Sequence, residues 1–172
     1  GYAGAVEALR REAAYTHLNR LVGLKCLELR GHLVIEGEPT ETVTCRPEYG
    51  DRPKWLWVLR ERESRYRFGE EAEESLWREA LTMAGAAISS DIHVLFDPDA
   101  PHAQVWPSHR VLRECVDALN ALPEDAYRAD ALLGWVYQYF QTEEKDRVFE
   151  EARTQKKKIE GADIIPVTRS WW

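Results

Sequence analysis

The stretch LLGWVYQYF, residues 132–140, is a dense apolar and aromatic block, and its interpretation decides the fold. Only Gly134 and Gln138 interrupt it with side chains that are not apolar. A helix that is apolar on every face is buried on every face. Aromatic side chains can also stack on the bases of a nucleic acid, but at helical spacing they more commonly build cores. We therefore expect a central helix of a small bundle here, and base stacking is the alternative.

Segments rich in strong helix formers lie on both sides of this block. Residues 3–30 contain no proline and many Ala, Leu, Glu and Arg residues, so they predict a long helix. The segment from residue 70 begins with four glutamates among its first five residues, which suits the positive end of a helix dipole. Ser108 is a suitable N-cap for the segment that follows it. The expected helices cover residues 3–30, 54–66, 70–88, 109–122, 131–140 and 143–158.

Two segments rich in glycine or proline separate these helices. Residues 31–53 contain three glycines and three prolines with β-branched residues between them, and they predict a long ordered loop or a small hairpin. Residues 91–108 contain three prolines, which excludes a continuous helix. We expect an ordered connector there, held by Val94, Leu95, Phe96 and Trp106. The predicted fold is mainly α, a helical bundle of about six helices with a Gly/Pro-rich loop or hairpin near residues 31–53.

Length and charge exclude several classes of protein. A chain of 172 residues suggests one domain, and we expect it to cover residues 1–160. The net charge of −7 argues against a domain whose main function is to bind nucleic acid. No apolar run is long enough to span a bilayer, so no membrane partner is expected. Three separated cysteines suggest reduced thiols in a cytoplasmic protein, and no two potential ligands have the spacing of a zinc site.

Five segments of the chain, taken in order, resemble one family. The combination is similar to the N-terminal region of PglX-type adenine-specific DNA methyltransferases, which belong to BREX phage-defence systems and are similar to large restriction-modification fusion enzymes. The resemblance covers nearly the whole chain. The segments are REAAYTHLNRLVGLKCLE (11–28), ISSDIHVLFDPDAP (88–101), WPSHRVL (106–112), LGWVYQYFQTEEKDRVFE (133–150) and KKKIEGADIIPVT (156–168).

This resemblance implies a longer parent enzyme that transfers a methyl group from S-adenosylmethionine to N6 of adenine in a short DNA site. Such enzymes flip the target base out of the duplex. The implied partners are double-stranded DNA, a methyltransferase domain after this chain and other defence-system proteins. Ile165, Pro166 and Thr168 match the family's joint to that domain, so residues 161–172 would begin the linker. Arg169 departs from the family pattern, which usually has Gln at this point.

The loops that carry the family's chemistry are missing from this sequence. An N6-adenine methyltransferase needs an Asn/Asp-Pro-Pro-aromatic loop for the flipped base, and the chain contains no Pro-Pro pair. The Phe-x-Gly-x-Gly cofactor loop is also missing. We therefore expect a non-catalytic scaffold and docking domain with no catalytic, cofactor-binding or metal-binding residue of its own. A stand-alone helical adaptor derived from such a domain is the alternative.

The candidate DNA-binding residues are Arg153, Lys156, Lys157 and Lys158, which form the only basic run of the chain. Cations at a helix C-terminus are also stabilised by the helix dipole, so a solvated helix end is the competing interpretation. The run directly precedes the expected methyltransferase domain. For that reason contact with DNA phosphates is an equally good hypothesis.

Two further residue patterns resemble those of metal-binding sites. Pro98-Asp99 and Glu143-x-Lys145 resemble the signature of a small Mg²⁺-dependent nuclease, but Glu143 follows Thr142 where acidic residues commonly begin a helix. Asp97, Asp99 and His102 could hold a metal ion, whereas a proline turn stabilised by its own side chains explains the same residues. We favour the structural explanation in both cases. His17 lacks a nucleophile as sequence neighbour and is expected to be a structural or surface histidine.

Overall fold

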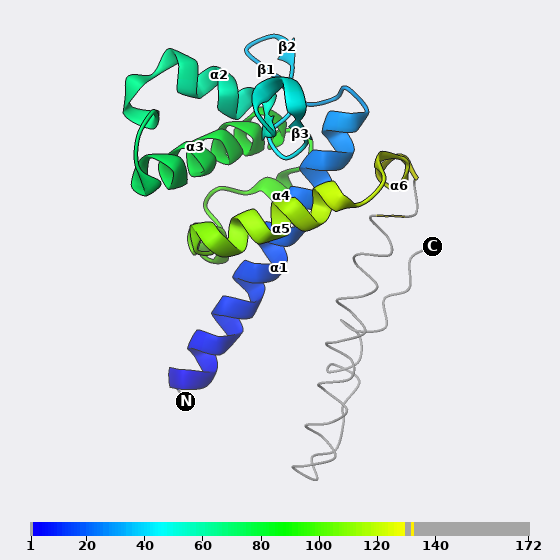
Figure 1. Cartoon of the computed structure of the whole chain (residues 1–172). Coiled ribbons are helices and arrows are strands. Elements are labelled where there is room, and N and C mark those ends of the chain that lie inside the picture. The colour runs from blue at the N-terminus through cyan, green and yellow to red at the C-terminus, as the bar shows by residue number, and fades with distance from the viewer. Residues whose placement is uncertain (1, 130–131, 133–172) are drawn as a thin grey trace. The chain divides into compact units, whose positions relative to one another are not determined.

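The computed structural model describes residues 2–129 and 132. The chain divides into two compact units, Gly1–Ala129 and Asp130–Trp172, and the helices and strands named here belong to the first. This unit is mainly α, with two small two-stranded hairpins (Figure 1). The mainly α class expected from the sequence is confirmed. The helices expected at 131–140 and 143–158 lie outside the described residues, so the bundle of about six helices stays a prediction.

The longest element is α1 (Tyr2–Leu29), close to the helix expected over residues 3–30. Its first turns project beyond the other labelled elements (Figure 1), and nearly all side chains up to Glu12 are exposed or partly exposed. All six residues from Leu21 to Cys26 are buried. A helix segment buried all round lies in the centre of its unit, so the second half of α1 is central to the part of the chain that the structure describes.

Gly23 allows another element to approach α1 closely. A Cβ atom placed on Gly23 would lie 3.2 Å from Cδ2 of Leu95 and 3.8 Å from Cζ of Phe96. Both contacts belong to α4 (His93–Phe96). Glycine lowers helix propensity, but here the missing side chain creates the space into which α4 packs.

Residues 31–53 form the hairpins expected from their glycines and prolines. Gly37 (φ 83°) and Glu36 (φ 54°) make the turn of the first hairpin, and Gly50 (φ 67°) lies in the loop of the second. Positive φ at both central residues is typical of a tight hairpin turn. Both strand pairs are antiparallel. The strands are β1 (Val34–Ile35), β2 (Glu38–Pro39), β3 (Cys45–Arg46) and β4 (Arg52–Pro53), with a 3-10 turn η1 at Pro47–Tyr49.

A buried carboxylate fixes the segment between the two hairpins. Glu28 accepts hydrogen bonds from the backbone N–H groups of Thr42 (2.6 Å), Val43 (3.0 Å) and Thr44 (2.9 Å), and from the Thr42 hydroxyl (2.8 Å). Burial raises the pKa of Glu28, and these donors oppose that shift because they favour the ionised form. The loop is therefore anchored to the C-terminal end of α1.

The helix expected over residues 54–66 is shorter in the structure. Element α2 is Lys54–Arg62, and a separate 3-10 turn, η2, covers Ser64–Tyr66. Glu63 between them is extended (φ −120°, ψ 113°), so the helix ends at Arg62. The break buries the Tyr66 ring while its hydroxyl donates to Glu79 of α3 (Glu70–Ile88).

The helices and the connector predicted from residue 70 onward are largely confirmed up to residue 129. The bounds of α3 match the predicted helix over residues 70–88, and α5 (His109–Ala121) begins after Ser108, whose hydroxyl accepts from the Val111 N–H. The connector over residues 91–108 is ordered, as expected, but it includes two short helical pieces. These are α4 and the 3-10 helix η3 (Pro101–Gln104), and α6 (Glu124–Arg128) follows α5 after Pro123. No helix among the described residues is long and apolar enough to cross a membrane.

Candidate binding pocket

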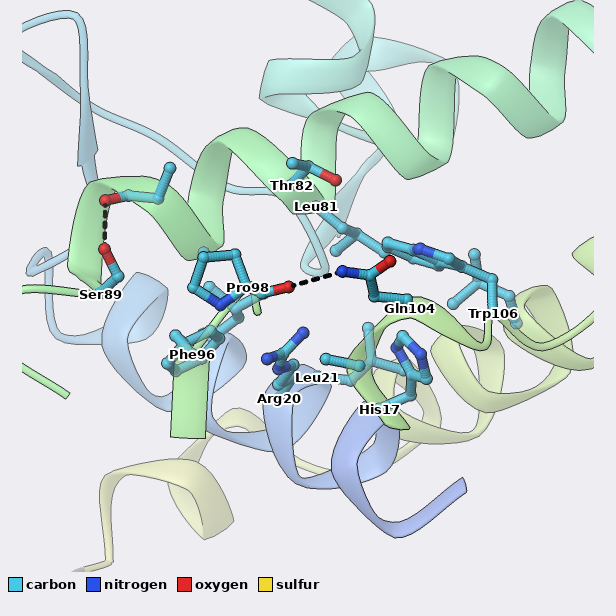
Figure 2. Close-up of a pocket in the computed structure, with 15 residues that line it drawn as sticks. His17, Arg20, Leu21, Leu81, Thr82, Ser89, Phe96, Pro98, Gln104 and Trp106 are labelled. Atoms are coloured by element: carbon cyan, nitrogen blue, oxygen red, sulfur yellow. Dashed lines mark hydrogen bonds between the residues drawn. The ribbon is translucent and has the colours of Figure 1, made fainter. Parts of the chain in front are cut away.

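A pocket of about 370 Å³ lies where α1, α3 and the proline-rich connector meet. Its walls are mainly apolar, and a few polar side chains reach into it (Figure 2). Small-molecule sites typically combine an apolar lining with a small number of convergent polar groups in roughly 300–1,000 Å³. The pocket therefore lies at the small end of that range.

Arg20 is the charged group of this pocket. Its Nε donates to the carbonyl of Leu95 (2.8 Å) and its Nη2 to the carbonyl of Asp97 (2.7 Å), so α1 holds the backbone of the connector. The side chain lies in the middle of the labelled group in Figure 2. No carboxylate of the described residues comes within ion-pair distance of it, although Asp97 is near enough to raise the pKa of Arg20. Burial has the larger effect and lowers that pKa.

His17 lies one turn of α1 before Arg20 and is 7 % exposed. Its Nε2 lies 3.0 Å from the carbonyl oxygen of Val105, so that nitrogen carries the hydrogen and donates. Burial lowers the pKa of His17, and the positive charges of Arg20, His102 and Arg78 act in the same direction. The expectation of a structural histidine is confirmed, because its partner is a backbone carbonyl and it joins α1 to the connector.

Two aromatic side chains form the walls of the pocket on either side of Arg20 (Figure 2). The Phe96 ring is buried, and the Arg20 guanidinium lies 5.8 Å from its centroid. Trp106 is partly exposed and packs on His17 with ring centroids 4.7 Å apart. These rings confirm that Phe96 and Trp106 hold the connector in place. The side chain of Val94, expected to do the same, is not among those described.

The rim of the pocket carries uncharged polar groups. The Gln104 amide donates to the carbonyl of Pro98 at 3.5 Å, which is long for a hydrogen bond. The hydroxyl groups of Thr82 and Ser89 donate to the backbone carbonyls of Arg78 and Ala86 in α3. Gln104 is therefore the rim group with the most free capacity to bind a ligand.

The sequence carries only part of the signal for this pocket. His17, Arg20, Leu21 and Leu24 follow the i, i+3, i+4, i+7 spacing of one helix face. A positive charge in such a stripe indicates either a buried ion pair or a cation with a special partner. The partners of Arg20 are backbone carbonyls 75 and 77 residues away, which no local pattern reveals.

The predicted DNA-binding residues lie outside the described part of the chain. This applies to Arg153, Lys156, Lys157 and Lys158, and also to the aromatic block over residues 133–140. The assignment of the block to a core and of the lysines to DNA contact therefore stay predictions. The second half of the nuclease-like signature, Glu143-x-Lys145, lies in the same region.

The metal-like group around Pro98 forms a turn, as favoured from the sequence. The backbone N–H of Asp99 donates to Oδ1 of Asp97 (2.9 Å), which is the bond of an Asx turn. His102 lies near another partner, with Nδ1 3.8 Å from Oε2 of Glu12. Within residues 2–129, no group of three or more His, Cys, Asp or Glu side chains has the arrangement of a metal site.

Comparisons with known protein families, with characterised proteins and with solved structures gave no match to this chain.

Proposed function

We propose that the chain is the N-terminal helical domain of a site-specific DNA adenine-N6 methyltransferase that acts in phage defence or restriction-modification. Its role is that of a scaffold and docking module for the catalytic domain. S-adenosylmethionine is bound by the parent enzyme and not by this chain. The domain extends over residues 1–160 as a bundle of about six helices, residues 161–172 lead into the methyltransferase domain, and the enzyme works on cytoplasmic DNA.

One observation carries the proposal. Three of the segments that resemble PglX-type enzymes line the same pocket, although residues 29–87 separate the first segment from the other two. His17 and Arg20 come from the first segment, Phe96 from the second and Trp106 from the third. Segments that share a family resemblance and also share one packed site are better explained by a common domain than by separate accidental similarities.

The first test is the reading frame that follows residue 172. We expect it to continue into a domain with a Phe-x-Gly-x-Gly loop and an Asn-Pro-Pro-aromatic loop. A natural stop at Trp172 would contradict the proposal and would favour the stand-alone adaptor. Cells that express the complete protein should contain N6-methyladenine at one short DNA site, detected by modification-sensitive sequencing, and should lose it when residues 1–160 are deleted.

The second test uses the chain alone. Incubation with labelled S-adenosylmethionine and mixed-sequence DNA should transfer no methyl group, because the catalytic loops are missing from this sequence. The complete protein serves as the positive control under the same conditions. Reproducible transfer by the chain that disappears on mutation of one of its own residues would overturn the non-catalytic assignment.

A further inference from the structure

The pocket between Phe96 and Trp106 has the properties of a ligand site. Its cation, Arg20, is fixed by two short hydrogen bonds to carbonyls that carry no net charge. Arg20 is partly buried and burial lowers its pKa, so a negative partner beside the guanidinium would stabilise its charge. The Asp97 carboxylate, the nearest acid by its electrostatic effect, accepts instead from the N–H of Asp99.

The other charges around the pocket do not supply that partner. Arg78 lies over the Trp106 ring at 5.8 Å and is itself paired with Glu74 at 2.5 Å. His102 is positioned near Glu12. Among the described residues around the pocket, Arg20 is therefore the cation that a bound anion would contact.

The space beside this cation is mainly apolar, and Phe96 and Trp106 are among its lining residues. Phe96 packs closely on α3, because a Cβ on Gly85 would lie 3.4 Å from Cδ1 of its ring, so the ring occupies the space that a side chain on Gly85 would need. Aromatic rings favour stacked or edge-to-face contact with another flat group. A planar guanidinium with free donors binds a carboxylate with good geometry.

We propose that this pocket binds a small carboxylate with a flat apolar body. The carboxylate lies on the free edge of the Arg20 guanidinium, the body rests against Phe96 and Trp106, and the Gln104 amide donates a further hydrogen bond at the rim. Occupation of the pocket would join α1, α3 and the connector through one ligand. This inference is independent of the proposed scaffold role, because it concerns the chemistry of the site alone.

The test compares an acid with its neutral amide. The 172-residue chain is titrated with 3-phenylpropionate and with 3-phenylpropionamide, and binding is followed by calorimetry and by shifts of the Trp106 indole and Arg20 Nε–H signals in NMR spectra. For a fragment of this size we expect a Kd of about 1 mM. The amide should bind about tenfold more weakly, since it loses the charge-assisted bonds.

Two matched variants locate the site. Ala86 is exposed and lines the pocket, whereas its neighbour Ala87 is exposed on the same helix and does not line it. Ala86→Phe should narrow the pocket and abolish binding, and Ala87→Phe should leave the Kd unchanged. Arg20→Lys keeps the charge but loses the planar fork, so the preference for acid over amide should shrink.

Three results would overturn the proposal. They are equal binding of acid and amide, binding that persists in Ala86→Phe, and no binding of the acid at about 10 mM, roughly ten times the expected Kd. If Arg20→Lys does not fold, the comparison of acid and amide in the original chain, Ala86→Phe and Ala87→Phe still tests whether the carboxylate binds in this pocket.

Discussion

The ammonium of Lys25 donates a 2.8 Å hydrogen bond to Oδ1 of Asn120, which joins the buried part of α1 to α5 over 95 residues of sequence. Lys25 is 1 % exposed, and burial lowers its pKa. Its nitrogen also lies 5.1 Å from the centroid of the Tyr127 ring, a favourable cation–π arrangement. A cation in the centre of the unit is thus held by an amide and a ring.

Asn120 uses its full hydrogen-bonding capacity in this network. Its Oδ1 also accepts from the Cys45 N–H (3.0 Å), and its Nδ2 donates to the carbonyls of Val43 and Val116 (both 2.9 Å). One side chain therefore connects α1, the second hairpin and α5. A buried donor or acceptor that loses its partner is more costly than the same group in water.

The first prediction concerns the removal of this amide. Asn120→Ala should lower the free energy of unfolding by about 2–4 kcal/mol, because it removes the hydrogen-bond acceptor of the buried Lys25 ammonium and of the Cys45 N–H, and the donor to the Val43 carbonyl. Chemical denaturation followed by circular dichroism measures the effect. The chain has one other asparagine, Asn19, whose change to Ala should cost less than about 0.5 kcal/mol. Similar losses in both variants would show that the network adds little.

The second prediction concerns the contact between α1 and α4. Gly23→Val should destabilise the unit by about 1–3 kcal/mol, since the added atoms collide with Leu95 and Phe96. Gly4 lies in the exposed first turn of the same helix with nothing within 4 Å of an added Cβ. Gly4→Val should therefore leave the melting temperature almost unchanged. If both variants melt like the original chain, α4 does not pack on Gly23 as described.

The third prediction concerns the pH dependence of stability. Burial lowers the pKa of His17, so the folded chain binds a proton at this site less readily than the unfolded chain. Where the unfolded state holds more protons, stability rises with pH. The contribution of His17 should thus be absent at low pH and should appear as the pH rises through the folded value toward about 6.5, the usual histidine pKa.

Denaturation curves at about pH 5, 6 and 7 test this sign. His17→Gln should reduce the rise in unfolding free energy over that interval, whereas His32→Gln, which retains His17, should show the rise. A steeper rise in His17→Gln than in the original chain would contradict the assignment of a buried neutral histidine.

Local sequence patterns were sufficient for the long helices. The bounds of α3, the start of α5 after Ser108 and the length of α1 follow from helix formers and capping, which act within a few turns. The break at Glu63 was missed because helix propensity over residues 54–66 is continuous, while the burial of Tyr66 against Glu79 decides the conformation. Tertiary contacts commonly override propensity in this way.

The pocket and the polar network depend on distant residues, which explains why the sequence did not reveal them. Arg20 meets the backbone of Leu95, and Lys25 meets Asn120, only after the connector and α5 have folded onto α1. In the sequence each of these side chains looks like an ordinary polar residue of a helix. Periodicity within a segment shows which face of a helix a residue lies on, but it does not show which distant group that residue meets.

The last prediction concerns the basic run near the C-terminal end of the sequence, and it rests on the proposed function. Lys156, Lys157 and Lys158 directly precede the expected methyltransferase domain, so we expect them to contact DNA phosphates in the complete enzyme. Each such contact releases counterions, and the logarithm of the binding constant then falls with the logarithm of salt concentration by about 0.9 per contact. Changing all three lysines to Gln in the complete enzyme should weaken binding to every DNA sequence alike and make the salt dependence shallower, with the methylated site unchanged.

Fluorescence anisotropy over a salt series measures the slope, and Lys54→Gln, a single change at the start of α2, is the control. A slope that does not move in the triple variant would identify the run as a solvated helix end, where the helix dipole alone accounts for the lysines.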